Sequence, residues 1–370
     1  MKLLHYYLLV FLIILSTIDR FDSSYLSTNI LGITVRYSHI LSIFPALLLI
    51  RYKNIGLPLL FYITCLSFSG IYNDTINSSI SLIIAILFSF YIFYLPALSF
   101  AERYPDFGVK AILQSSRILM LAGIGLQLTG YTERMGAFFY EPAYMSIFMA
   151  AYVSLCFTEP KLVKPIDYIL LILFLYLSVS AAFILVIFGL VLYFLLTNKN
   201  KILKLFSLIY LLLMIYYLSI ERSNLNYYIT EAFITFDFQN LLEFSKQRTG
   251  ERLDFFMTSL RKVIESPLFG IGPRSFQSLY NGIPPANIFF QIILESGLLG
   301  FLVCIFAIKK FFYDVRVLGN YKNFITCTSI ALLITLQIES TYMRAYLWIF
   351  FGIFNGIIIY DKKIKEGIDQ

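Results

Sequence analysis

The chain has 370 residues, of which 59% are hydrophobic and only 14% are charged. A soluble domain carries about 25% charged residues, so this composition excludes an ordinary water-soluble protein. The net charge of +7 would suit nucleic acid in a soluble protein. In so apolar a chain the positive-inside bias of membrane proteins explains it better, and we expect no nucleic-acid partner.

Apolar stretches recur along the whole chain, each long enough to cross a hydrocarbon core about 30 Å thick. They are continuous and do not alternate, which indicates helices and argues against a membrane β-barrel. The sequence therefore predicts an all-α integral membrane protein with about 12 transmembrane helices. In chain order we expect them at residues 3–18, 30–50, 55–70, 76–100, 109–130, 142–158, 166–178, 181–197, 202–219, 287–308, 322–338 and 343–360.

Lysine and arginine indicate the direction in which these helices cross. Reading residues 166–197 as one span would reverse all later segments and put the lysine clusters outside, so two helices and two cytoplasmic termini are the consistent interpretation. In that orientation 17 of the 29 basic residues fall in predicted cytoplasmic segments: Lys2, Arg51, Lys53, Arg103, Lys110, Lys161, Lys164, Lys199, Lys201, Lys204, Lys309, Lys310, Arg316, Lys322, Lys362, Lys363 and Lys365.

One long connection breaks this regular pattern. Residues 220–286 form a predicted periplasmic loop of 67 residues, and connections of that length are uncommon unless they have a function. Apolar residues recur in it at three- and four-residue spacing, which predicts an amphipathic helix over residues 250–265 that ends before Pro267. The chain thus divides into transmembrane helices 1–9 (residues 1–219), the loop (220–286), and transmembrane helices 10–12 with a short cytoplasmic tail (287–370).

The basic residues outside the predicted cytoplasmic segments are of an unusual type. Ten of these twelve are arginine, whereas the cytoplasmic set has fourteen lysines and three arginines. Topology needs only positive charge and does not explain the difference. A guanidinium group binds phosphate oxygens in pairs, which an ammonium group cannot do. The split predicts an outer-face site for a phosphate or pyrophosphate; the alternative is chance combined with ordinary surface ion pairs.

Two charged residues lie inside predicted helices. Arg117 belongs to the fifth helix, where a charge costs at least about 2.5–3.5 kcal/mol unless it faces a cavity or a partner. It therefore either binds a substrate or pairs with another residue. Glu295 lies about eight residues into the tenth helix, where a carboxylate needs a cation or a proton nearby.

Further candidates flank the predicted outer turns. Arg134 and Glu141 precede the sixth helix, although a carboxylate there also suits a plain helix start. Glu339 and Arg344 flank the last outer turn and could simply pair with each other.

In the long loop, Arg248 and Arg252 are four residues apart and would share one helical face. Gly270 and Gly272 bracket one residue, which permits a tight turn with exposed amide groups beside Arg274.

Two adjoining stretches of the chain form a recognisable pattern. They read Glu251-Arg-Leu-Asp-Phe-Phe, then Ile264-Glu-Ser-Pro-Leu-Phe-Gly-Ile-Gly272, and Asn287-Ile-Phe-Phe-Gln-Ile-Ile-Leu-Glu-Ser-Gly-Leu-Leu-Gly300. They resemble the O-antigen polymerase and O-antigen ligase superfamily. Residues 134–142 are similar to an outer-loop motif of the polymerase branch. Ligases of this family carry a catalytic histidine just before the position of Asn287; here Ala286 stands there, and the chain's only histidines are His5 and His39. The resemblance therefore favours a polymerase over a ligase.

The resemblance implies a glycosyltransferase of the bacterial inner membrane. Its substrates would be undecaprenyl pyrophosphate carrying a growing glycan and a second carrier holding one repeat unit, amid membrane lipids and with a chain-length regulator as a partner. Arginines would stabilise the leaving pyrophosphate and a carboxylate would act as base. No carboxylate pair is spaced like a cation site, so we predict metal independence and no cofactor. A ligase and a flippase of the same lipid-linked unit stay open as alternatives; a flippase would not need the long outer loop.

These roles fall on named positions. The catalytic residues would be Arg252 and Arg274, with Glu295 as base ahead of Glu141 and Glu339. The pyrophosphate and the glycan would be bound with the help of Arg117, Arg134, Arg248, Asn287, Glu339 and Arg344.

Overall fold

The computed structural model describes residues 2–18, 27–30, 33–51, 56–130, 137–139, 142–178, 181–197, 252–280, 285, 287–337 and 344–367. Its first helices are α1 (Lys2–Leu15), α2 (Tyr37–Leu49), α3 (Leu57–Tyr72), α4 (Ile76–Ser89), α5 (Leu95–Ala101), α6 (Pro105–Leu128) and α7 (Pro142–Thr158). The others are α8 (Pro165–Ser178), α9 (Ala181–Thr197), α13 (Arg252–Glu265), α14 (Ser275–Leu279), α15 (Ile288–Arg316), α16 (Lys322–Thr335) and α17 (Ala345–Lys365).

Three stretches within the described residues are long and apolar enough to cross a membrane: Ile76–Ala101, α6 and α15. Shorter apolar helices accompany them, among them α1, α3 and α16. The architecture is thus that of the helical membrane protein predicted from composition. Twelve crossings and an outer position of residues 220–286 stay predictions.

The stretch Ile76–Ala101 is one rod with a widened turn in its middle. The turn is η1 (Phe90–Tyr94), a π-helix between α4 and α5. Pro96 follows at the start of α5, where its missing N–H removes one hydrogen bond of the helix. A π-turn shifts the bonding pattern by one residue, so the rod continues past the proline without breaking.

α17 packs closely on this rod because two glycines stand on its contact face. A Cβ atom on Gly356 would lie 2.6 Å from the carbonyl oxygen of Leu98, and one on Gly352 would overlap the carbonyl of Tyr94. Small residues allow such close helix contact where neither helix gains from leaving lipid. The other side of α17 contributes aromatic rings to the core, and the ring centroid of Phe350 lies 5.1 Å from that of Phe148 in α7.

The predicted helix boundaries can be compared with the observed ones. Those at 142–158 and 181–197 are confirmed to the residue. The helix predicted at 30–50 is wrong at its start, because β1 (Ser27–Ile30) pairs antiparallel with β2 (Ile33–Arg36) and α2 begins only at Tyr37. Isoleucine, threonine and valine at 33–35 are β-branched, so they suit a strand better than a helix. The predicted helix at 202–219 lies outside the described residues.

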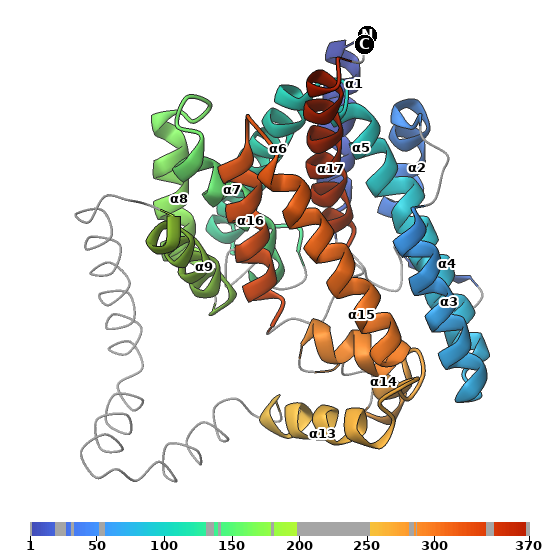
Figure 1. The fold of residues 1–370 in the computed structure, drawn as a ribbon. Helices are drawn as coiled ribbons and strands as arrows, with labels where there is room; N and C mark the ends of the chain where they lie inside the picture. Colours follow the sequence, from blue (N-terminus) through green and yellow to red (C-terminus); the bar gives the residue numbers. More distant parts are fainter. Residues whose placement is uncertain are drawn as a thin grey trace.

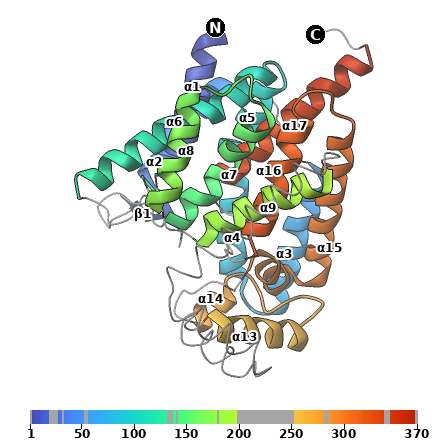
Figure 2. The same ribbon diagram turned by 90° about the vertical axis from the view of Figure 1, so that its left-hand side faces the viewer.

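The two ends of the molecule differ. α1 begins and α17 ends at one end, and α13 and α14 lie at the other (Figures 1 and 2). At the first end Lys362 pairs with Asp314 at 2.7 Å and Lys363 pairs with Glu102 at 2.5 Å. We call this the lysine-rich end. Arg274 precedes α14 at the opposite end.

Candidate functional site

α15 changes direction at Gly297, whose φ of 69° and ψ of −175° are not helical. Its short first part (288–296) lies across the long second part (298–316), as Figure 1 shows. A Cβ atom on Gly297 would overlap the carbonyl group of Leu268, and the positive φ would strain any L side chain. The sequence predicted one helix here, and the bend is a correction to that prediction.

The bend exists because the turn 266–274 replaces a broken helical hydrogen bond. In a continuous helix the N–H of Leu298 would donate to the carbonyl of Leu294. Here Leu298 donates to Pro267 O at 2.8 Å, and Leu294 O accepts from Ile271 N at 2.8 Å. Both groups stay satisfied, as buried backbone must. The glycine turn expected from the sequence is therefore present and docks into the kink.

The tip between α3 and α4 holds the other side of this turn. The Ser69 hydroxyl donates to Phe269 O at 2.5 Å, and the Asn73 amide donates to Gly270 O at 3.2 Å. The ring centroid of Tyr72 lies 4.8 Å from that of Phe269. Two hydrogen bonds and a ring contact thus link segments about two hundred positions apart in the chain.

Arg274 stands at the end of the docked turn in an unusual backbone conformation. Its φ of 57° is in the left-handed region, and it precedes the first residue of α14. Non-glycine residues in this region cost roughly 1–3 kcal/mol and gather at functional sites, where the surrounding structure holds them. The side chain is half-buried.

Glu295 lies on the first part of α15, next to the residue that receives the turn. It is 2% exposed, and its Oε1 accepts a hydrogen bond from Gln291 Nε2 at 3.1 Å. Asn287 begins the same segment as its N-cap, with its side-chain oxygen accepting from Phe290 N at 2.9 Å. Because Ile271 N donates to Leu294 O, the backbone next to Glu295 is linked directly to the turn leading to Arg274. We call the first part of α15, this turn with Ser275, and the α3–α4 tip (residues 69–75) that contacts the turn the kink site.

Two hydroxyl groups in the kink site have no hydrogen-bond partner among the described residues. They belong to Thr75, in the α3–α4 tip, and Ser275, the first residue of α14, and both oxygen atoms are buried. A Cβ atom on Gly272 would overlap the Thr75 hydroxyl and lie 3.1 Å from that of Ser275. The two hydroxyls therefore flank the same glycine, where a bound polar group would satisfy them.

α13 covers the first part of α15 from outside. The ring centroids of Phe256 in α13 and Phe290 in α15 are 5.0 Å apart, and Ser259 of α13 is fully buried. Figure 1 shows α13 lying crosswise to the long part of α15. The predicted amphipathic helix is thus confirmed over 252–265, and it ends before Pro267 as expected.

For five of the predicted site residues, the structure does not describe the side chain. Arg252 is the first residue of α13, but its side chain is not described. Residues outside altogether are Arg134, Glu141, Arg248 and Glu339.

Two predicted site residues lie at other places in the fold. The Arg344 guanidinium carbon stands 3.6 Å from the ring centroid of Tyr144, near the start of α7. Arg117 of α6 pairs with Asp167 of α8 at 2.6 Å, three residues after Lys164. The structure thus places Asn287 and Glu295 on the first part of α15 and links the backbone of that part to the turn that ends in Arg274. Arg117 lies elsewhere and is paired across α6 and α8.

Sequence reasoning missed the contribution of the α3–α4 tip. Ser69, Asn73 and Thr75 end an apolar helix and begin the next, a position that polar residues occupy in any connection. Nothing in their spacing pointed to a loop two hundred positions later. As for metals, the described ranges contain no group of three histidine, cysteine or acidic side chains that could hold an ion.

A family model matches part of the chain. Residues 168–305 match the model of the family described as O-antigen ligase. The matched segment begins in α8 and ends in α15, so it includes the docked turn, Asn287 and Glu295. No curated protein sequence matches the chain.

Proposed function

We propose that this membrane protein polymerises a bacterial surface polysaccharide. The proposal is supported by the match of residues 168–305 to the O-antigen ligase family, whose superfamily also includes polymerases. Its substrates are undecaprenyl-pyrophosphate-linked oligosaccharides. The enzyme joins their repeat units by glycosyl transfer at the outer face of the inner membrane.

The observation that carries the proposal is the hydrogen bond from Ile271 N to Leu294 O, 2.8 Å long. It fixes the backbone beside a buried carboxylate, Glu295, to the turn that ends in Arg274. Catalysis by positioning needs both groups held in place before the substrate arrives. A loop of this length that merely connected two helices would not require such a link.

The proposed reaction uses a carboxylate as the base and guanidinium groups to bind the pyrophosphate. A hydroxyl of the incoming repeat unit attacks the anomeric carbon of the growing chain, and the bond from that carbon to the pyrophosphate oxygen breaks. The hydroxyl proton passes to a carboxylate, and the electron pair leaves with undecaprenyl pyrophosphate. Guanidinium groups stabilise the charge that develops on the departing pyrophosphate.

In this proposal Arg274 and Arg252 bind the pyrophosphate and Glu295 accepts the proton. Glu295 is almost fully buried, so the attacking hydroxyl would have to enter the kink site to reach it. The hydroxyls of Thr75 and Ser275, which no described residue binds, offer hydrogen bonds to a sugar or phosphate there. Arg117 is left out, because Asp167 already occupies its guanidinium.

The proposed orientation has both termini in the cytoplasm and the kink site at the periplasmic surface. It is supported by the gathering of lysines where α1 begins and α17 ends, since cytoplasmic segments are rich in basic residues. It is also supported by α13, an amphipathic helix that lies crosswise at the opposite end (Figure 2). A carrier lipid whose glycan faces the periplasm would meet the kink site directly.

A ligase is the second candidate, because the matching family model carries that description. Such an enzyme would move a finished polymer to a different lipid. The two histidines of the chain lie elsewhere: His5 is in α1, and the ring centroid of His39 in α2 is 5.6 Å from that of Phe93. The position before Asn287 holds alanine, so the histidine expected of a ligase is replaced there.

The deciding experiment gives the purified full-length protein a synthetic undecaprenyl-pyrophosphate-linked repeat unit and follows products on a gel. A polymerase makes a ladder from this substrate alone. A protein that makes no ladder but transfers a preformed glycan to a second lipid is a ligase. In cells, loss of a polymerase leaves single repeat units on the surface lipid, and loss of a flippase leaves none.

A further inference from the structure

Two adjoining cavities lie between α3, α15 and α17, apart from the groups of the kink site. Their volumes are about 250 and 360 Å³. Pro58 and Ala307 line both, so the cavities meet at these two residues. No step of the proposed glycosyl transfer uses them.

The smaller cavity is apolar. It begins at Ile292, on the first part of α15, and almost no polar surface faces it. The other lining side chains are those of Leu59, Tyr62, Ile86, Val303, Cys304 and Trp348. Such a lining suits a hydrocarbon chain, which loses nothing by leaving the lipid phase for it.

The larger cavity contains polar groups and one uncompensated positive charge. Lys310 lines it and forms no ion pair within the part of the chain that the structure describes. Asp314, one helical turn later, is already bound by Lys362 at 2.7 Å. Ser329 of α16 is 2% exposed and its hydroxyl has no partner among the described residues. A positive charge and an unpartnered donor together fit one phosphate group.

The joined cavities are polar at one end and apolar at the other. The polar part includes Asp314 and so adjoins the lysine-rich end, whereas the apolar part reaches Ile292 near the kink. A carrier lipid with its pyrophosphate beside Arg274 would need the reverse arrangement. The cavities therefore do not suit the proposed substrate.

We propose that the two cavities form one binding site for an anionic glycerophospholipid. Its phosphate lies beside Lys310 and Ser329, and an acyl chain fills the apolar cavity beside Cys304 and Trp348. A headgroup with a neutral alcohol balances the single positive charge, whereas a headgroup with its own ammonium group would set like charges together. The proposal does not depend on the reaction proposed above.

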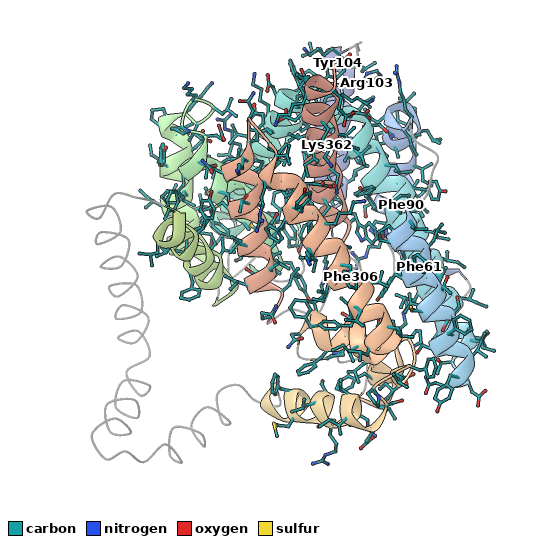
Figure 3. All side chains as sticks on the ribbon, in the orientation of Figure 1. Phe61, Phe90, Arg103, Tyr104, Phe306 and Lys362 are labelled. Carbon is teal, nitrogen blue, oxygen red and sulfur yellow. The ribbon has the colours of Figure 1, made fainter. Side chains whose placement is uncertain are left out.

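The bilayer has access to the helices that enclose the site. Phe61 of α3 is 54% exposed and Phe306 of α15 is 65% exposed. Both are labelled in Figure 3, on the ribbons of these two helices. Exposed aromatic side chains on helices of this hydropathy suit contact with acyl chains, so a phospholipid reaches the cavity sideways from the membrane.

The test is native mass spectrometry of the full-length protein in detergent with added phosphatidylglycerol or phosphatidylethanolamine. One phosphatidylglycerol should be retained per chain, in preference to phosphatidylethanolamine. Lys310→Gln should weaken retention about fivefold, the effect of one lysine at a membrane surface. The matched control is Lys309→Gln, which removes the same charge beside the cavity without lining it.

A second pair of variants tests the apolar part. Ala307→Phe fills the junction of the cavities and should abolish retention, whereas Ile305→Phe, which lines neither cavity, should leave it unchanged. Equal retention of the two phospholipids would overturn the proposal. So would equal losses from both lysine variants, or displacement of phosphatidylglycerol by an equal concentration of undecaprenyl phosphate.

Discussion

The guanidinium of Arg117 donates two hydrogen bonds to the carboxylate of Asp167, from Nε at 2.7 Å and from Nη2 at 2.6 Å. Asp167 is fully buried and also accepts from the Tyr152 hydroxyl at 2.9 Å and from Lys164 N at 2.7 Å. Every oxygen of this carboxylate is thus engaged, and the pair joins α6 to α8. Arg117 acts here as a structural partner.

Replacing one member of this pair should destabilise the protein strongly. Arg117→Ala leaves the buried Asp167 carboxylate without its cation, which costs roughly 3–5 kcal/mol. The double variant Arg117→Met with Asp167→Asn should recover much of that loss. The asparagine oxygen can still accept from Lys164 N, and its amide NH2 can donate to the hydroxyl oxygen of Tyr152, which keeps its own bond to the carbonyl oxygen of residue 167. Thermal unfolding in detergent measures both. A single Arg117→Ala variant with unchanged unfolding temperature and no polymer would instead make Arg117 a substrate ligand.

Gly297→Ala should release the docked turn. The added methyl group meets the Leu268 carbonyl, and the positive φ alone costs about 1–3 kcal/mol for an L residue. Limited proteolysis should cut within 266–280 in this variant and not in the unmodified protein, and polymer formation should fall with it.

Gly125→Ala is the matched control, since it is the same change in a helix where a Cβ would meet nothing within 4 Å. Alanine there should add about 0.5–1 kcal/mol of helix stability. If the protease cut residues 266–280 no faster in Gly297→Ala than in Gly125→Ala, the turn would not depend on the kink at Gly297.

Thr75→Ala and Ser275→Ala should reduce activity without reducing stability. Their hydroxyls have no partner among the described residues, so removing them leaves nothing unpaired and should keep the unfolding temperature equal or slightly higher. Polymer formation should nevertheless fall if the substrate supplies the missing partner. Ser69→Ala is the contrasting variant, because its hydroxyl bonds to Phe269 O at 2.5 Å and its loss should cost about 1 kcal/mol. Full activity in both Thr75→Ala and Ser275→Ala would remove these hydroxyls from the site.

Chelation should not affect the reaction. In the proposed reaction, guanidinium groups carry the positive charge that a divalent ion supplies in other pyrophosphate-releasing enzymes. Polymer formation by the purified protein should continue at an unchanged rate in excess EDTA. Loss of the ladder that magnesium or manganese restores would refute metal independence.

The helices were largely predictable because hydrophobic length dominates the sequence. Residues 142–158 and 181–197 could be bounded correctly from Pro142 and from the small residues before Ala181. The hairpin at 27–36 was not found, because its strands are four residues each and too short to establish an alternating pattern. The π-turn at 90–94 was missed for a different reason, since hydropathy does not distinguish one helical hydrogen-bond pattern from another.

The candidate site was predictable only in its local parts. Gly270, Gly272 and Arg274 indicated a tight turn beside a cation, and that turn is present. What receives the turn could not be predicted, because Gly297 reads as an ordinary helical glycine until another backbone occupies the space of its Cβ. Arg117 shows the opposite problem. Its burial cost was evident from the sequence, but its partner Asp167, 50 positions away, was not.

The rate of ladder formation by Arg274→Lys tests the central claim most directly, with Arg261→Lys as control. Lysine keeps the charge at 274 but loses the paired grip on phosphate oxygens, and loss of such a donor should slow polymerisation by about 100-fold. Arg261 is exposed on α13, so the same change there should leave the rate unchanged. A ladder from Arg274→Lys that forms as fast as that of the unmodified protein would contradict the account.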